Sequence, residues 1–187
     1  MSVLRSGYVA LVGRPNAGKS TLFNTILGQR LSIVTAKPQT TRQRVLGILT
    51  RDDSQTVFLD TPGLLESSYR LHQNLERQIE RSTRDADLIV LLLDAQRLHD
   101  RSDLIHTFLA GLGARRKQLI VVLNKVDAVE LHTIDALVAD AKKTFAFEEV
   151  WLLSALRGTN VSHLLSEIGQ RLPPGPALYP PDMVADQ

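Results

Sequence analysis

The chain has 187 residues, 43% of them hydrophobic, which suits one domain that buries most of its apolar surface. It contains no cysteine, which excludes disulfides and thiolate metal sites, and its net charge of +2 gives little support for nucleic-acid binding through bulk charge. The longest purely apolar run, Leu88–Leu93, is too short to cross a bilayer, and the N-terminus lacks the apolar core of a signal peptide. We therefore expect an intracellular protein without a transmembrane segment.

The first predicted element is a strand, Tyr8–Val12, which leads directly into a loop with the pattern G-x-x-x-x-G-K-S and then into the helical sequence Thr21–Leu27. Glycines in such a loop let successive backbone N–H groups turn toward an anion at the positive end of the helix dipole. The pattern predicts a phosphate-binding loop in which Lys19 reaches the β- and γ-phosphates and Ser20 binds Mg²⁺. The nucleotide-binding residues predicted here are Gly13, Arg14, Pro15, Asn16, Ala17, Gly18, Lys19, Ser20 and Thr21.

Further apolar runs of strand length alternate with helical patterns, which predicts a doubly wound α/β sheet with right-handed crossovers and helices on both faces. The exception is the short connection Arg51–Gln55, which predicts a hairpin and therefore one antiparallel edge strand. The six predicted strands are Tyr8–Val12, Val45–Thr50, Thr56–Leu59, Leu88–Leu93, Leu119–Leu123 and Val150–Leu153. After the first helix, the predicted helices are His72–Arg84, Asp103–Leu112, His132–Phe145 and Val161–Arg171.

Two segments fall outside this alternation. The segment Gln29–Gln43 has no steady hydrophobic period, and a loop of this length in a compact domain is more often functional or mobile than inert. From Leu172 onward the chain is rich in proline, which ends the last helix and predicts an extended linker.

A second phosphate motif follows the third predicted strand directly and consists of Asp60, Thr61, Pro62 and Gly63. This places Asp60 at the carboxyl edge of the sheet, where open α/β sheets bind ligands. A carboxylate there can hold Mg²⁺ through a water, and Gly63 can present its N–H to a γ-phosphate. The alternative is a Pro-Gly turn capped by an aspartate, and the nearby phosphate-binding loop makes the Mg²⁺ role the better interpretation.

A base-recognition motif, Asn124-Lys125-Val126-Asp127, ends the fifth predicted strand. The Asp127 carboxylate can accept two parallel hydrogen bonds from guanine N1–H and its 2-amino group, and adenine offers neither donor. Asn124 would tie the loops together, and Lys125 would lay its aliphatic stem along the base. After the last strand come Ser154, Ala155 and Leu156, with the Ala155 N–H placed to donate to guanine O6.

With these motifs in this order, the chain resembles the Ras-like GTPases of the translation-factor-related class and, within them, the Era family of ribosome-assembly GTPases. The segment Lys37–Arg42 and the tail with Tyr-Pro-Pro-Asp, Leu172–Asp182, indicate this family more narrowly than the nucleotide motifs do. The resemblance implies a Ras-like P-loop GTPase domain over residues 1–172. It also implies that residues 173–187 are a linker toward an RNA-binding KH domain that these 187 residues do not include.

The resemblance also implies a catalytic set of Lys19, Thr41, Gly63 and Asn16. Switch I would cover Gln29–Gln43, with Thr41 preferred over Thr40 as a Mg²⁺ ligand beside Ser20 and Asp60, and switch II would begin at Thr61. Leu64 stands where Ras-type enzymes carry a water-orienting glutamine, so we expect slow intrinsic hydrolysis. Asn16 resembles the asparagine that helps to hold K⁺ in related GTPases, and the alternative is an asparagine that only braces the loop.

The function implied is a switch that binds GTP and GDP with Mg²⁺, hydrolyses GTP to GDP and phosphate, and acts in small-subunit assembly and 16S rRNA maturation. The partners implied for the full-length protein are the small ribosomal subunit and 16S rRNA, mainly through the KH domain. We expect a cytoplasmic monomer, with peripheral contact at the inner membrane left open. The alternatives are the GTPase module of a tRNA-modifying or tandem-domain ribosome-assembly GTPase, and a guanine-nucleotide scaffold that does not hydrolyse GTP.

Overall fold

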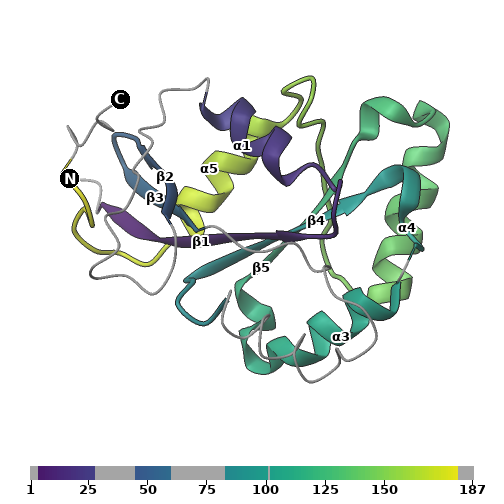
Figure 1. The fold of residues 1–187 in the computed structure, drawn as a ribbon, viewed down its shortest axis with the longest axis horizontal. Coiled ribbons are helices and arrows are strands. Elements are labelled where there is room, and N and C mark those ends of the chain that lie inside the picture. The colour runs from purple at the N-terminus through teal and green to yellow at the C-terminus, as the bar shows by residue number, and fades with distance from the viewer. Residues whose placement is uncertain (1–3, 28–44, 60–82, 101, 181–187) are drawn as a thin grey trace.

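The computed structural model describes residues 4–27, 45–59, 83–100 and 102–180. The strands are β1 (Arg5–Gly13), β2 (Val45–Thr50), β3 (Ser54–Leu59), β4 (Leu88–Asp94), β5 (Leu119–Asn124) and β6 (Trp151–Leu152). Within the described residues they form one six-stranded sheet in the order β2-β3-β1-β4-β5-β6 (Figure 1). Strand β2 is antiparallel to β3, and all other neighbouring strands are parallel. The predicted sheet, mostly parallel with one antiparallel edge strand, is confirmed.

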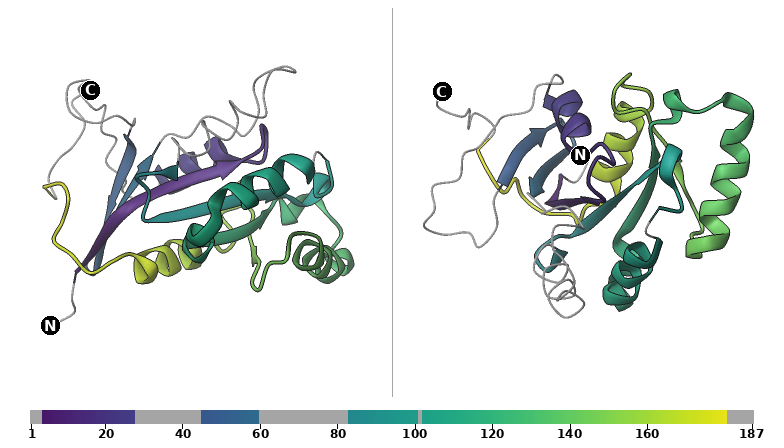
Figure 2. Two further views of the ribbon diagram at one scale, coloured as in Figure 1. Left: turned by 90° about the horizontal axis from the view of Figure 1, so that it is seen from below. Right: turned by 45° about the vertical axis from the view of Figure 1, so that its right-hand side comes forward.

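Helices cover both faces of this sheet, as the two views of Figure 2 show. The helices are α1 (Lys19–Leu27), α3 (Ser102–Leu112), α4 (Ile134–Phe145) and α5 (Val161–Arg171). Short 3₁₀ turns connect several elements: η1 (Ala95–Arg97), η2 (Gly113–Gln118), η3 (Val126–Ala128) and η4 (Leu131–Thr133). No helix within the described ranges is both long and apolar enough to cross a bilayer.

The apolar sequence of strand β4 is uninterrupted because both faces of the strand are buried. Successive residues of a strand point to opposite faces, and both faces of this strand are covered. One core cluster combines Ile89, Leu91 and Leu93 with Phe108 of α3 and Phe145 of α4. The other combines Leu88, Val90 and Leu92 with Leu22 of α1 and Leu164 of α5. The central strand thus belongs to two hydrophobic cores, which hold the ends of the parallel strands in register.

Several predicted boundaries change. Strand β1 begins at Arg5 because residues 5–7 pair with residues 54–56 of β3. Strand β3 begins at Ser54 rather than Thr56, so the hairpin turn is shorter than predicted. Strand β6 contains only two residues rather than the predicted four, because it pairs with β5 only through Val122 and Leu123. Helix α4 begins at Ile134, after η4, rather than at His132. The predicted helix His72–Arg84 lies almost wholly outside the described residues.

Residues 173–180 of the proline-rich tail dock on the sheet. We call this segment the C-terminal strap, and Figure 1 shows it in yellow beside the start of β1. The Ser6 N–H donates to the Pro173 carbonyl at 3.1 Å, and the Gly175 N–H donates to the Leu4 carbonyl at 3.0 Å. Residues 173–180 thus bond to the start of β1, and the division into a GTPase domain and a linker stays a prediction.

A buried glutamine holds the strap. Gln55 of β3 is 0% exposed. Its Oε1 accepts the backbone N–H groups of Leu178 and Tyr179 at 2.7 and 2.9 Å, and its Nε2 donates to the Tyr179 carbonyl at 2.9 Å. A buried amide needs partners for both ends, and the strap supplies them. A glutamine that no sequence motif singled out thus fixes the last described segment of the chain.

Candidate nucleotide site

The predicted phosphate-binding loop, residues 13–20, connects the carboxyl end of β1 to the start of α1. The loop reverses through two residues with positive φ, Asn16 with φ 63° and Gly18 with φ 101°. A Cβ at Gly18 would lie 2.2 Å from Asn124 Nδ2, so only glycine fits there. A Cβ at Gly13 would lie 2.8 Å from the Leu92 carbonyl oxygen. The two fixed glycines of the pattern are therefore required by the neighbouring strands as well as by the loop.

Lys19 lies at the first position of α1 and points back over the loop. Its Nζ donates to the carbonyl oxygens of Gly13 at 2.6 Å and Arg14 at 3.0 Å. Burial lowers the pKa of the Lys19 ammonium below its usual value. Ser20 and Thr21 follow in the first turn of the helix, and both are exposed. The loop thus offers a cation, hydroxyl groups and the N-terminus of a helix on one surface, which is the chemistry of an anion site.

The outer half of the loop is attached to the segment after β4. Arg14 Nη1 donates to the Arg97 carbonyl at 3.1 Å, and Arg14 Nη2 lies 3.7 Å from Asp100 Oδ2. Pro15 and Asn16 are exposed. Turn η1, which contains Arg97, therefore braces the loop from outside.

Asn124, the last residue of β5, joins two loops. It is 1% exposed. Its Nδ2 donates to the Ala17 carbonyl at 2.8 Å, and its Oδ1 accepts the Ala155 N–H at 2.9 Å. The predicted tie between the loops is confirmed. The Ala155 N–H, which the sequence assigned to guanine O6, is donated to Asn124 in this structure.

Asp127 lies in η3 and is exposed. Its Oδ1 accepts the Ser154 hydroxyl at 2.5 Å, and the Ser154 Oγ in turn accepts the Arg157 N–H at 3.0 Å. These contacts orient the carboxylate. Leu156, on the facing loop, is 72% exposed. The segments 124–128 and 154–157 therefore form one surface with an oriented acceptor and an apolar side chain.

Two of the predicted groups lie outside the described residues. They are Thr41, with the rest of the predicted switch I, and the second phosphate motif, Asp60, Thr61, Pro62 and Gly63, together with Leu64. Strand β3 ends at Leu59 and runs parallel to β1, so Leu59 lies at the carboxyl edge of the sheet, which carries the phosphate-binding loop.

Asp94, the last residue of β4, was not predicted as a site residue. Its Oδ2 accepts Lys125 Nζ at 2.7 Å, so a different strand contributes to the contacts around the base motif. With Arg14, Gln96 and other residues, Asp94 and Lys125 line a cavity of about 140 Å³. A polar residue directly after a buried strand was the signal that selected Asp60 and Asn124, and the same signal was available at Asp94.

Comparison with known proteins agrees with this geometry. The family model described as "50S ribosome-binding GTPase" matches residues 8–125. The GTPase Era of Mesorhizobium japonicum is 43% identical over 182 residues, which cover 97% of this chain and 58% of that protein. The chain thus spans about six tenths of the length of this relative.

Solved structures give the same result. A variant of Aquifex aeolicus Era bound to GDP·AlF₄⁻ is 34% identical, with a TM-score of 0.74, and the match covers 98% of this chain and 62% of that one. A structure of Era in complex with MgGDPNP and nucleotides 1506–1542 of 16S ribosomal RNA is also 34% identical. Its TM-score is 0.75, and the match covers 97% of this chain and 61% of that one.

Proposed function

Because this chain belongs to the family of 50S ribosome-binding GTPases, we propose that it binds GTP and GDP and hydrolyses GTP as a switch of the Era type. The observation that carries the proposal is the position of Asn124. Its buried amide bonds the phosphate-binding loop at Ala17 and the base loop at Ala155, so both motifs belong to one site. A site that combines an anion-binding loop with an oriented carboxylate is suited to one guanine nucleotide.

The phosphates and the base are bound by different parts of this site. Backbone N–H groups of residues 13–20 and the Lys19 ammonium bind the phosphates, and the Lys19 contacts with loop carbonyls are exchanged for phosphate oxygens. Asp127 accepts the two guanine donors, with Ser154 fixing its orientation. Lys125 and Leu156 provide aliphatic surface for the faces of the base. The Ala155 N–H would reach guanine O6 only as a donor shared with Asn124.

The donor set present in the loop fits Mg²⁺, because the exposed Ser20 hydroxyl stands beside the anion-binding surface. Ser20, with Asp60 and Thr41 as further proposed ligands, would hold the ion, which neutralises charge on the β- and γ-phosphates when bound. Gly63 would donate its N–H to the γ-phosphate. These assignments make the predicted switch segments sensitive to the γ-phosphate.

Hydrolysis by this chain should be slow. Leu64 cannot orient a water, so the proposed site depends on the loop N–H groups, Lys19 and a further cation. We propose that Asn16, exposed and in the left-handed conformation, contributes to a K⁺ site.

A role in assembly of the small ribosomal subunit is proposed from the relatives. A similar Era structure contains a fragment of 16S ribosomal RNA, and the chain corresponds to about six tenths of that protein. We propose that contact with rRNA belongs mainly to the part of such proteins that follows this domain. The monomeric state and the peripheral membrane contact remain predictions.

The test is a comparison of labelled GTP and ATP binding, followed by single-turnover hydrolysis in K⁺ and in Na⁺ buffers with Mg²⁺. We expect GTP and GDP to bind, ATP to bind far more weakly, and phosphate release to be faster in K⁺. Equal affinity for ATP would contradict the base assignment, and equal rates in the two salts would remove the cation proposal.

Leu64 also favours a second candidate, a scaffold that binds guanine nucleotides without hydrolysing them. Absence of phosphate release in K⁺ and Mg²⁺, with normal GTP binding, would select it. Copurification of the full-length protein with a tRNA-modification partner rather than a ribosomal particle would select the tRNA-modifying alternative.

A further inference from the structure

Asp94 divides its two carboxylate oxygens between two tasks. The residue is 8% exposed and lies beside Asn124 in the parallel register of β4 and β5. Its Oδ1 accepts the Gln96 N–H at 3.0 Å and so caps turn η1, and its Oδ2 accepts Lys125 Nζ at 2.7 Å. A buried carboxylate with both oxygens engaged has a fixed orientation, so the ammonium it holds is fixed as well.

Lys125 is a side chain that needs such a partner. Its backbone is in the left-handed conformation with φ 66°, and its side chain is 31% exposed. A lysine loses much rotamer freedom when it is ordered, and a nucleotide that had to order it would bind less tightly. The Lys125 ammonium is bonded to Asp94 of β4, and Asp127, two residues further along the loop, is bonded to Ser154 instead.

Turn η1, which Asp94 caps, is attached to both halves of the nucleotide site. On one side the Arg97 carbonyl accepts Arg14 Nη1 of the phosphate-binding loop at 3.1 Å. On the other side Gln96 Nε2 donates to the Ala128 carbonyl of η3 at 3.3 Å. The position of Asp94 is therefore set relative to the phosphate loop and the base loop together.

We propose that Asp94 is a positioning residue for nucleotide binding, which holds Lys125 in place so that its aliphatic stem lies ready along the face of the base. This inference rests on the proposed function, because it concerns the same nucleotide site. The base is common to GDP and GTP, so loss of the ion pair weakens both nucleotides by the same factor.

The variant Asp94→Asn tests the proposal. Asparagine keeps an oxygen that can cap the Gln96 N–H but cannot form the ion pair. We expect the dissociation constants of GDP and GTP to rise together by up to about tenfold, because binding must then order the Lys125 side chain. The melting temperature of the ligand-free chain should fall as well, because the ion pair is also made without nucleotide, so both affinities are measured at a temperature where the variant is folded. Asp103→Asn, which removes an equal charge from the exposed first turn of α3, is the matched control and should leave both affinities unchanged.

A double-mutant cycle separates positioning from a merely structural or charge effect. Lys125→Met retains most of the apolar stem without the ammonium, so Asp94→Asn should have no further effect on affinity in that background. Equal losses in the two backgrounds, or unchanged affinity in Asp94→Asn alone, would overturn the proposal. If the wild-type chain bound neither nucleotide, the proposed function itself would fail, whereas normal wild-type binding with an unaffected Asp94→Asn variant would reject only the role of Asp94.

Discussion

At each edge of the sheet, a buried side-chain amide joins separate segments of the chain, but the two edges serve different purposes. At the carboxyl edge the buried amide of Asn124 joins the phosphate and base loops, and at the amino edge the buried amide of Gln55 joins β3 to the C-terminal strap. The segments that Asn124 joins keep exposed polar groups, such as Ser20 and Asp127. At the amino edge, Gln55 is bonded at both ends to the backbone of the strap. The Asn124 amide thus orders loops that remain accessible to a ligand, and the Gln55 amide fixes the C-terminal strap to the sheet.

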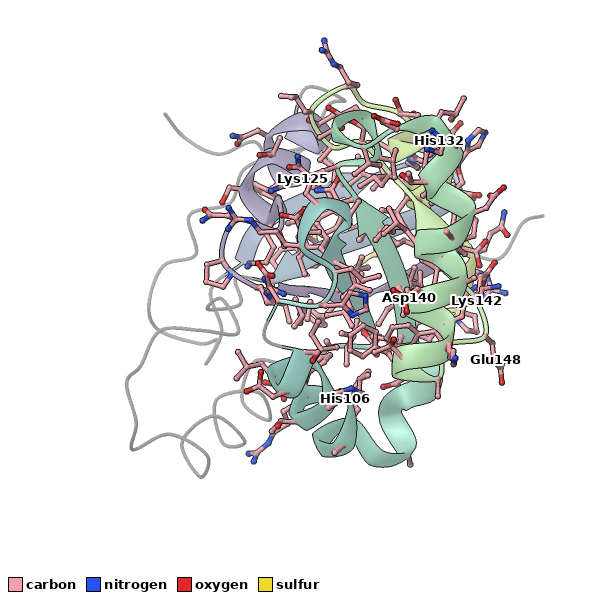
Figure 3. The ribbon with its side chains drawn as sticks, turned by 90° about the vertical axis from the view of Figure 1, so that its right-hand side faces the viewer. His106, Lys125, His132, Asp140, Lys142 and Glu148 are labelled. Atoms are coloured by element: carbon pink, nitrogen blue, oxygen red, sulfur yellow. The ribbon has the colours of Figure 1, made fainter. Side chains whose placement is uncertain are left out.

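Gln55 is the second residue of β3, and Asn124 is the last residue of β5. In Figure 3, Lys125 and His132, which follow β5, lie toward one end of α4, and Glu148, which precedes β6, lies toward the other end. The hydrogen bonds of Asn124 and those of Gln55 involve no common residue. Changes at the carboxyl edge should therefore alter ligand binding, and changes at the amino edge should alter stability.

The largest effect is expected for Asp127→Asn. An asparagine cannot accept both guanine donors, so the affinity for GDP and GTP should fall by about a thousandfold, on the order of 4 kcal/mol. The urea midpoint should stay near that of the wild type, because Asp127 is exposed and asparagine can still accept the Ser154 hydroxyl. Isothermal titration calorimetry with denaturation measures both quantities. Retained guanine affinity would show that the carboxylate does not read the base.

Gly18→Ala should be an exception to this division between binding and stability, because it disturbs both. An alanine at this position would have to adopt φ near 101°, and its methyl group would lie 2.2 Å from Asn124 Nδ2. The Asn124 side chain, which joins the two loops, would therefore be displaced. We expect a loss of about 3 kcal/mol in the free energy of unfolding, together with weaker nucleotide binding. Gly111→Ala in α3, where a Cβ meets nothing within 4 Å, is the matched control and should not destabilise the domain. Equal stabilities of the two variants would contradict the steric argument.

Gln55→Ala should affect stability alone. It removes the partners of two strap N–H groups and one strap carbonyl, which should cost about 2 kcal/mol in urea denaturation and expose residues 173–180 to proteases. Nucleotide affinity should not change. Gln55→Glu keeps the acceptor for the strap N–H groups but places an unpaired carboxylate at a fully buried site opposite the Tyr179 carbonyl, so it should destabilise the domain at least as much as Gln55→Ala. A change in GTP affinity in either variant would show that the edges are coupled.

Ser6→Ala should have the smallest effect. The Ser6 hydroxyl donates to the Pro176 carbonyl at 2.6 Å, and its removal should lower the free energy of unfolding by about 1 kcal/mol, again with normal nucleotide binding. Because the Ser6 N–H still bonds Pro173, the strap should remain docked. A loss as large as that of Gln55→Ala would mean that the hydroxyl, rather than the glutamine, holds the strap.

Much of the fold could be predicted because its signals are local. The apolar runs of β4 and β5, the phosphate-loop pattern and the hairpin between β2 and β3 each occupy a few consecutive residues. The limits of β1 and β6 could not be predicted in the same way. They depend on how far the partner strands extend beside them, and a run of apolar residues does not contain that information.

By itself, the sequence determined the order of the strands along the chain and the residues that carry the nucleotide chemistry, because each motif is a short pattern at the end of a strand. Only the tertiary structure decided which side chains complete those motifs. Asp94 meets Lys125 across 31 positions, and Gln55 meets Leu178 across 123. Such contacts follow from the packing of a parallel sheet, which brings distant strand ends to a common edge, and no local pattern records them.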